Sequence, residues 1–292
     1  MTKQKFNKYI NVLLDLAKIR ITFFVSVSTS IGFILNSGSV NSKMVISAIG
    51  VFLLAAGSSA LNHYQERRFD ALMERTKSRP IPSGFLTPAF ALVYAIVLSV
   101  LGSLILGLFI NATALILGLV ALVWYNLFYT PLKRKYVMAV VPGSVIGAIP
   151  PVIGWVSAGG SILDTQAIAL ALFFFIWQIP HFWLLLMIYG KDYEKAGYPT
   201  LTRVFSDNQL SRITFIWISA LATSVLLIPL VSITTNIVTV LLLVSLGIWL
   251  TYNSKNILKE YINKIQYRKA FINVNVYVLI VVLFLSIDRL FL

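Results

Sequence analysis

Three oxygen-bearing side chains recur at four-residue intervals in the first polar segment of the chain: Asn62, Glu66 and Asp70. On an α-helix this spacing places them on one face, with a drift of about 40° per step. Carboxylate and amide oxygens gathered in this way suit Mg²⁺, a hard cation that proteins bind through one or two carboxylates together with substrate phosphates. The pattern predicts a magnesium site at a helix end, and the alternative is a helix end with ordinary i,i+4 ion pairs.

Three cationic side chains follow these ligands closely: Arg75, Lys77 and Arg79. The planar guanidinium of arginine matches phosphate oxygens in a bidentate manner, and lysine supplies a point charge. Carboxylates followed closely by cations form the arrangement that metal-bridged binding of a diphosphate requires. We therefore interpret residues 62–79 as a diphosphate-binding segment.

A second polar segment, residues 189–201, carries a similar mixture of charges. Its polar side chains include Tyr189, Lys191, Asp192, Tyr193, Glu194 and Lys195. By composition alone, a solvated loop would look the same. However, residues 66–88 and 190–212 together hold six of the ten acids of the chain. This pairing indicates one functional site to which both segments contribute.

Two histidines stand near these segments. His181 lies inside a stretch without formal charge, between Trp177 and Trp183, and an ionisable residue at membrane depth is a functional candidate by default. It could ligate a metal or hydrogen-bond a substrate, or it could be satisfied by a neighbouring helix. His63 follows Asn62 directly and could touch the same ligand.

The elements that must position these residues are membrane-spanning helices. Only 12% of the 292 residues are charged, against about 25% in a typical soluble domain. A spanning helix needs about 20 apolar residues. Stretches free of Asp, Glu, Lys and Arg run over residues 21–42, 44–65, 80–132, 136–163, 165–190, 213–254 and 270–287. We expect the third to break near Asn111 and the sixth near Ser232–Asn236, which gives nine spans and an all-α membrane protein.

Two further features fall inside these stretches. Pro150 and Pro151 are expected to break the fifth span, because proline removes a helix hydrogen bond, and the freed carbonyls must then be satisfied by neighbours or line a cavity. The alternative is a kink that serves packing. The aromatic residues Trp124, Tyr125, Phe128 and Tyr129 form either an interfacial belt or the wall of a substrate channel, and the belt is the interpretation favoured for Tyr129.

The distribution of basic residues predicts the topology. With a cytoplasmic N-terminus and an external C-terminus, all of the 24 lysines and arginines except Lys43 and Arg289 fall on the inner side. This bias follows the positive-inside rule, so the net charge of +14 reflects topology and contact with membrane lipid, not nucleic-acid binding. Residues 1–17 form a short amphipathic cytoplasmic segment without the features of a signal peptide, and residues 1–292 are expected to form one membrane-embedded domain. Cysteine is absent, which excludes disulfides and thiolate metal sites.

Taken together, these motifs resemble the UbiA-type superfamily of intramembrane prenyltransferases. The family pattern of spaced acids followed by Met-x-Arg-Thr-x2-Arg-Pro stands here as Asn62, Glu66, Asp70, Met73, Arg75, Thr76, Arg79 and Pro80. The segment from Trp177 to Trp183, together with Lys191-Asp192-Tyr193, is similar to the haem-directed branch, the haem O synthases. Glu66 replaces the family's first aspartate, and the second segment lacks a doubled Asp-x3-Asp, which puts a site with two metals in doubt.

The resemblance implies a nine-helix bundle in the inner membrane of a bacterium and a Mg²⁺-dependent transfer of a farnesyl group from farnesyl diphosphate to a vinyl group of haem B. It implies that Mg²⁺ is held by Asn62, Glu66, Asp70 and Asp192. It implies that the diphosphate is neutralised by Arg75, Lys77, Arg79 and Lys191. It places His181, His63, Trp177 and Tyr193 at the acceptor.

Three alternatives stay open at this point. The same chemistry could use an aromatic acceptor of quinone biosynthesis, such as a hydroxybenzoate or a naphthoate. A secondary transporter would carry its polar site at the bilayer midplane, whereas the acids here cluster at the predicted cytoplasmic ends. A structural or assembly subunit would have no reason to carry two acidic loops.

Overall fold

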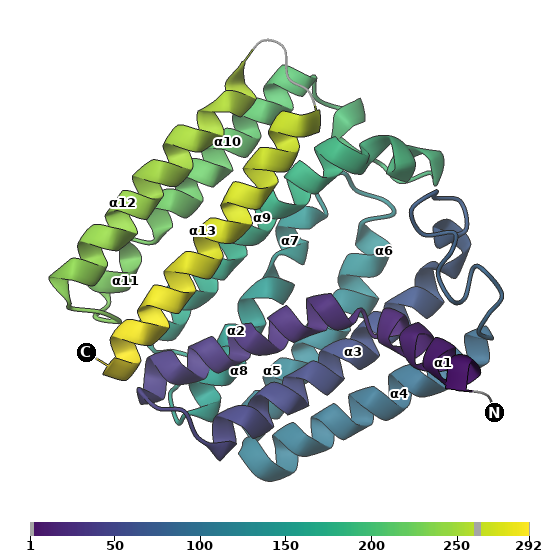
Figure 1. Ribbon diagram of the computed structural model, residues 1–292, viewed down its shortest axis with the longest axis horizontal. Helices are drawn as coiled ribbons and strands as arrows, with labels where there is room; N and C mark the ends of the chain where they lie inside the picture. The colour runs from purple at the N-terminus through teal and green to yellow at the C-terminus, as the bar shows by residue number, and fades with distance from the viewer. Residues whose placement is uncertain (1–2, 260–263, 292) are drawn as a thin grey trace.

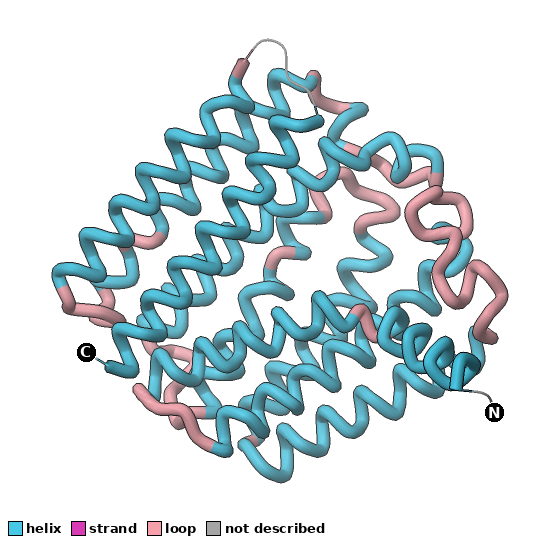
Figure 2. Tube along the Cα trace, viewed as in Figure 1, coloured by secondary structure: helices cyan, strands magenta, loops and turns pink. Residues whose placement is uncertain are grey.

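The computed structural model describes residues 3–259 and 264–291, with the side chains of residues 3–8 left aside. Within this part of the chain every regular element is a helix (Figures 1 and 2). Met1 and Thr2 of the predicted amphipathic segment lie outside the described residues, and so does Leu292.

Nine helical segments among the described residues are long and apolar enough to cross a membrane, as the charge-free stretches predicted. The single-helix spans are α2 (Ile19–Ser37), α3 (Ser42–Asp70), α9 (Thr165–Lys195) and α13 (Lys264–Phe291). The composite spans are α4 (Pro88–Ile105) with the π-helix η1 (Leu106–Ile110), α5 (Ala112–Val123) with η2 (Trp124–Tyr129) and α6 (Thr130–Leu132), α7 (Val140–Gly143) with α8 (Val145–Ser157), α10 (Asp207–Ser224) with α11 (Leu227–Leu230), and α12 (Ile237–Ser254) with η4 (Lys255–Leu258).

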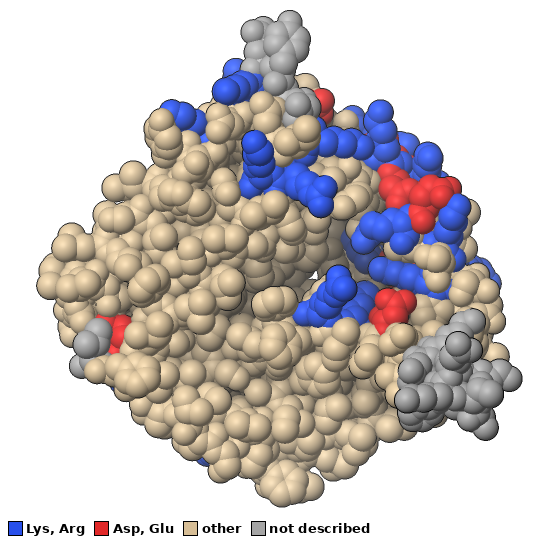
Figure 3. Space-filling model, in the orientation of Figure 1, with Lys and Arg blue, Asp and Glu red and all other residues tan. Residues whose placement is uncertain are grey.

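The helices pack as two neighbouring groups. In one group α3 contacts α2, α4 and α8, and in the other α9, α10, α12 and α13 contact one another in turn (Figure 1). Contacts of α8 with α9 and of α2 with α13 join the groups. The loops after α3 and α9, the 3-10 turn η3 (Leu201–Arg203) and the helix α1 (Lys3–Leu16) gather at the same end of the bundle. Lysines and arginines are concentrated there (Figure 3), and we call it the basic end.

Both predicted breaks within the long apolar stretches are confirmed. Asn111 has an extended backbone and caps α5, accepting a hydrogen bond from the backbone N–H of Ala114. Asn236 caps α12 in the same way through the N–H of Val238. Asparagine side chains satisfy N–H groups that a helix leaves unpaired at its start, so each break begins a new span.

The predicted break at Pro150 and Pro151 is wrong, because α8 continues through both prolines and the span is interrupted at Ser144 instead. The reason is close packing against α2. A β-carbon on Gly32 would overlap the carbonyl oxygen of Pro151, and one on Gly154 would overlap that of Thr29. The two backbones therefore approach without intervening side chains, as small residues allow in membranes.

The amphipathic N-terminal segment is helical, and α1 ends before Lys18, which adopts a left-handed backbone conformation with φ of 48°. A non-glycine residue rarely occupies this region. Leu16 is buried against α3 and α4, whereas Tyr9 and Leu14 are exposed. The turn at Lys18 separates α1 from α2 (Figure 1) and directs the lysine side chain toward α3.

Candidate active site

The three oxygen ligands predicted from the spacing lie on the last turns of α3, close to its end at Asp70. Asn62, Glu66 and Asp70 are 1%, 5% and 1% exposed, so these polar groups need partners in the protein or in a ligand. The predicted single helical face is confirmed. The spacing did not indicate that several basic side chains would contact this face.

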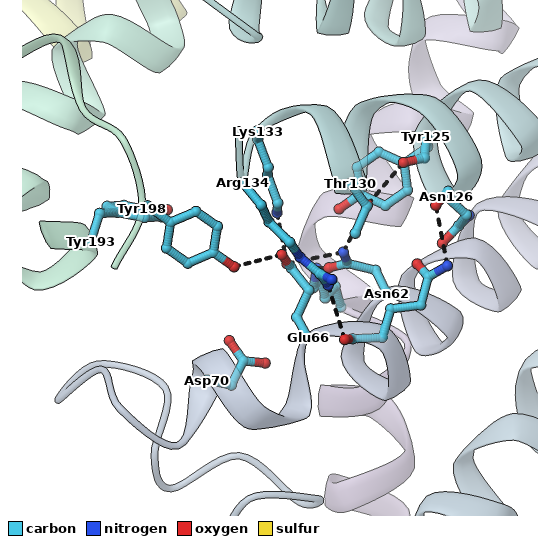
Figure 4. Close-up of polar contacts among 12 residues, drawn as sticks. Asn62, Glu66, Asp70, Tyr125, Asn126, Thr130, Lys133, Arg134, Tyr193 and Tyr198 are labelled. Atoms are coloured by element: carbon cyan, nitrogen blue, oxygen red, sulfur yellow. Dashed lines mark hydrogen bonds and ion pairs between the residues drawn. The ribbon is translucent and has the colours of Figure 1, made fainter. Parts of the chain in front are cut away.

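Glu66 is at the centre of the cluster (Figure 4). Its carboxylate accepts hydrogen bonds from Lys133 Nζ at 2.6 Å and from the Tyr198 hydroxyl at 2.7 Å. The Asn62 amide donates a third bond at 3.0 Å. Burial opposes the charge on Lys133, but the Glu66 carboxylate and the Tyr129 phenol group outweigh it and raise the pKa of the lysine. The carboxylate is thus fixed from three elements of the chain.

Asp70 pairs with the predicted cation Arg79, whose Nη1 lies 2.8 Å from each carboxylate oxygen. The intervening loop is held because the Thr76 hydroxyl donates to the Asp70 carbonyl oxygen at 2.9 Å. Arg79 is the predicted diphosphate residue that the structure places against the carboxylate face.

Lys18 reaches the same face from the turn between α1 and α2. Its ammonium group donates to Asn62 Oδ1 at 2.8 Å. Burial, together with the nearby charges of Arg79 and Lys133, lowers the pKa of Lys18 to about 7. Together with Arg79 and Lys133, Lys18 brings three basic side chains to the two carboxylates of Glu66 and Asp70.

The π-helix η2 positions Lys133 (Figure 4). The Asn126 amide donates to the Ser58 hydroxyl at 2.6 Å, Gln65 donates to the Asn126 carbonyl at 3.1 Å, and Asn62 donates to the Thr130 hydroxyl at 3.2 Å. These bonds join η2 and the start of α6 to α3. π-helical turns inside α-helices are frequent at functional sites, and here the turn sets Lys133 beside Glu66.

The aromatic residues of η2 divide between the two predicted roles. Tyr125 and Tyr129 stack on each other, and the Lys133 ammonium lies 5.5 Å from the centre of the Tyr129 ring. Phe128 is 57% exposed, as a lipid-facing residue of a belt would be. The tyrosines therefore wall the polar cluster, and Phe128 belongs to the outer surface.

The second polar segment contacts the backbone of the first through the side chain of Asp192. Asp192 accepts hydrogen bonds from the N–H groups of Glu74 and Arg75 at 3.1 and 3.3 Å, and Arg75 donates to the Tyr193 hydroxyl at 3.0 Å. The two polar segments thus form one site, as their pairing predicted. Asp192 holds the loop after α3 and forms no hydrogen bond with Glu66 or Asp70 among the described residues.

The remaining predicted residues lie around this centre. Lys77 is exposed and pairs with Glu74, and Lys191 is exposed. His63 is 1% exposed, and neither of its ring nitrogens has a hydrogen-bond partner among the described residues. His181 and Trp177 lie deeper along α9, where their ring centres are 5.2 Å apart. The roles of these residues stay predictions.

The oxygen donors fit a magnesium ion that is shared with a substrate. Among the described residues no group of three Asp, Glu or His side chains stands close enough to enclose a metal. Mg²⁺ is usually bound by one or two carboxylates together with substrate phosphates, not by a cage made only of protein. The buried oxygens of Asn62, Glu66 and Asp70 match the protein part of that requirement. The adjacent basic side chains suit the phosphate oxygens of the substrate.

Sequence reasoning missed Lys18, Lys133 and Tyr198 as site residues. Lys133 opens a basic triplet after the η2 aromatics, but the positive-inside rule explains such triplets without a site. Lys18 and Tyr198 come from segments 44 and 132 residues away from their partners on α3. No local sequence pattern predicts contacts between residues so far apart in the chain.

Membrane-spanning helices that bury carboxylates and basic side chains at one end provide a site for a charged group beside the membrane. The chain belongs to the UbiA prenyltransferase family, which it matches over residues 25–275. It is therefore a multi-pass membrane prenyltransferase, as the motifs indicated.

Curated relatives share one description. The protoheme IX farnesyltransferase of Geobacter sulfurreducens is 42% identical over 210 residues, which cover 72% of this chain and 77% of that protein. That of Nitratidesulfovibrio vulgaris is 34% identical over 210 residues, with coverages of 72% and 73%. The sequence-based resemblance to this branch of the family is thereby confirmed.

Solved structures share the fold. A structure from work on digeranylgeranylglyceryl phosphate synthase has a TM-score of 0.79 at 19% identity and covers 98% of this chain and 100% of that one. A UbiA homologue from Archaeoglobus fulgidus bound to GPP and Mg²⁺ has a TM-score of 0.66 at 15% identity, with coverages of 96% and 100%. The predicted UbiA-type bundle is confirmed.

Proposed function

We propose that this prenyltransferase transfers the farnesyl group of farnesyl diphosphate to a vinyl group of haem B, giving haem O. The observation that carries the reaction class is the buried cluster in which Lys18, Lys133 and Arg79 surround Glu66 and Asp70. The descriptions of the relatives support haem as the acceptor. The Archaeoglobus homologue, which was solved with GPP and Mg²⁺, supports a prenyl diphosphate and a metal.

The transfer begins at the C–O bond of the donor. As this bond breaks, its electron pair leaves with the diphosphate, and positive charge develops on the allylic carbon. The terminal carbon of the vinyl group then bonds to that carbon, and water adds to the adjacent carbon with loss of a proton. The balance is farnesyl diphosphate plus haem B plus water, giving haem O and diphosphate.

The polar cluster assists the first step. Asn62, Glu66, Asp70 and Asp192 would hold Mg²⁺, which supplies positive charge to the leaving diphosphate. Arg79, Lys18 and Lys133 stand ready to stabilise the same developing charge. Arg75, Lys77 and Lys191 complete the cationic rim at the basic end.

The apolar bundle protects the allylic cation while it bonds to the vinyl group. Tyr125 and Tyr129 line the cluster on the side of η2, and the faces of tyrosine rings tolerate a carbocation. His181, Trp177, Tyr193 and His63 are the proposed acceptor residues. Helices that exclude bulk water keep the cation from premature hydrolysis.

The orientation in the membrane follows from the same proposal. The basic end faces the cytoplasm of a bacterium, where positive charge is enriched in the inner membrane's loops. The N-terminus is then cytoplasmic and the C-terminus external, and residues 1–292 act as one domain.

The test is an assay of the detergent-purified full chain with haem B, farnesyl diphosphate and Mg²⁺, read by mass spectrometry. A haem product heavier by a farnesyl group plus a hydroxyl group, and abolished by EDTA, establishes reaction and acceptor together. Prenylation of hydroxybenzoate or naphthoate in a parallel reaction, without a haem product, would reassign the acceptor. The absence of a product with every acceptor would contradict the proposed reaction and favour the alternative hypothesis of a secondary transporter.

A further inference from the structure

The intramembrane histidine of α9 shares its hydrogen bond with α13. His181 Nδ1 lies 2.8 Å from Asn275 Oδ1. The amide group of Asn275 also donates from Nδ2 to the carbonyl oxygen of Phe271, four residues earlier in α13. Turning this amide round would set its oxygen against that carbonyl, so two acceptors would face each other. The contacts therefore fix which end of the amide meets the histidine.

This orientation determines the tautomer of His181. Asn275 presents an acceptor, so Nδ1 of a neutral imidazole must carry the proton, and Nε2 keeps its lone pair. No hydrogen bond to Nε2 is found among the described residues. Histidines that ligate metals donate their other ring N–H to an oxygen in this way, which fixes the ring and increases its basicity. His181 is thus prepared to be a ligand.

The surroundings of His181 are aromatic and apolar. The ring centres of Trp177, Phe271 and Phe182 lie 5.2, 4.9 and 5.4 Å from that of His181. His181 itself is half-buried, which leaves it accessible to a ligand. Aromatic walls around a neutral imidazole suit a planar iron tetrapyrrole, in which a histidine is a common axial ligand.

Helical geometry connects His181 to the prenyl site. Asp192 lies eleven residues further along α9, which is three turns and about 16 Å on nearly the same face. Trp177 lies one turn below His181 on that face as well. An acceptor bound at His181 therefore sits beneath the second polar segment, on the side of α9 from which the loop after α3 is held.

A cation marks where the carboxylates of such an acceptor would point. Arg268 stands two turns, roughly 10 Å, before Asn275 on the same face of α13. It is exposed, and no hydrogen bond or ion pair of Arg268 is found among the described residues. Figure 3 shows a hollow between the N-terminal end of α13 and the junction of α1 with α2, with basic side chains on both rims.

We propose that Asn275 is the positioning residue of the acceptor site: it holds His181 in the Nδ1–H tautomer, His181 Nε2 binds the iron of the tetrapyrrole, and Arg268 pairs with its carboxylates. This inference rests on the proposed function and adds the geometry of the acceptor to it. Neither Asn275 nor Arg268 carries any recognisable sequence motif, and both come from the last span.

The test measures ferric haem binding by the detergent-purified full chain without a prenyl donor, from the Soret band. The wild type is expected to bind haem with a nitrogen-ligated spectrum. His181→Gly should lose this signature, and added imidazole should restore it. Asn275→Leu should weaken binding about ten- to hundredfold, whereas Asn275→Asp, which keeps the acceptor, should retain it.

Two controls separate positioning from general damage. Asn253 of α12 makes the same bond to a carbonyl four residues earlier, but does not touch His181, so Asn253→Leu should bind haem like the wild type. Arg268→Gln should weaken binding of haem about two- to fivefold, and leave binding of haem dimethyl ester, which lacks the carboxylates, unchanged.

The outcomes are distinguishable from those of the activity assay. If the wild type forms haem O but Asn275→Leu and Arg268→Gln bind haem normally, the positioning role is overturned and the proposed function stands. A nitrogen-ligated spectrum that persists in His181→Gly without imidazole overturns the ligand assignment. If the wild type binds no haem and prenylates an aromatic acid, the acceptor and this inference both fall.

Discussion

Tyr198 donates its hydroxyl to Glu66 Oε1 across 2.7 Å and so joins the loop after α9 to the end of α3. Burial and the adjacent Glu66 carboxylate raise the pKa of Tyr198, so the hydroxyl keeps its proton and acts as a donor. The Tyr198 ring also packs against Phe69 of α3, at 5.2 Å between ring centres. The Tyr198 side chain thus orients the Glu66 carboxylate and also holds the two polar segments together.

Tyr198→Phe should therefore lower kcat/KM while leaving the fold intact. A hydrogen bond to a charged group contributes about 1.5–3 kcal/mol, which corresponds to roughly ten- to hundredfold in rate. Steady-state kinetics of haem farnesylation would measure the loss. Tyr136→Phe is the matched control, since Tyr136 is exposed at the basic end and should change kcat/KM by less than about twofold. Equal activity of Tyr198→Phe and the wild type would show that catalysis does not depend on the hydrogen bond from Tyr198 to Glu66.

Lys133→Met should reduce both stability and activity. Removing one partner of a buried ion pair leaves the other charge uncompensated, at a cost of about 3–5 kcal/mol, and Glu66 is 5% exposed. Thermal unfolding in detergent and the farnesylation assay would measure the two effects. Lys135→Met is the control, because Lys135 is exposed two residues away.

The double variant Lys133→Met/Glu66→Gln separates structure from chemistry. It removes both charges, so unfolding should return toward the wild-type temperature. Activity should stay low, because the proposed metal ligand and the cation near the diphosphate are both lost. Recovery of activity along with stability would mean that the pair is structural only.

The fold was largely predictable because its main determinant is local. The charge-free stretches gave the nine spans, and Asn111 and Asn236 begin helices where breaks were expected. The prediction of a break at Pro150 and Pro151 was wrong for a non-local reason, since the geometry there depends on contact with Gly32 of α2. A proline pair indicates a break in an isolated segment, but not in one packed against a neighbour.

The site was predictable where its residues share a helix. Spacing by four placed Asn62, Glu66 and Asp70 on one face, and Arg79 follows within nine residues of Asp70. Lys18 and Tyr198 reach the same face from distant segments, which no spacing rule encodes. A single sequence thus locates the carboxylates and leaves most of their partners to be found in the structure.

Asp70→Asn should weaken the binding of magnesium while preserving the bundle. The amide keeps the shape of the side chain and an oxygen for Arg79, but loses the charge that a hard divalent cation requires. We expect activity to need at least about tenfold more Mg²⁺ and Asp70→Ala to be inactive, as measured by titration from EDTA-treated protein. Asp207→Asn, at an exposed position on the same end, should titrate like the wild type. An unchanged magnesium profile in Asp70→Asn would contradict the metal assignment.

Gly154→Ala should destabilise the bundle although alanine favours helices more than glycine does. The added β-carbon would overlap the carbonyl oxygen of Thr29, which is backbone and cannot turn away, so α2 and α8 would have to separate. Overpacking of this kind costs about 1–3 kcal/mol, more than the roughly 1 kcal/mol of helix propensity that it gains. Tryptophan fluorescence during thermal unfolding in detergent should show the loss. Gly190→Ala is the matched control, because its β-carbon would meet side chains and no backbone: those of Thr202, at 3.3 Å, and Leu186, at 3.8 Å. If both variants unfold like the wild type, the close contact of α2 with α8 does not limit stability.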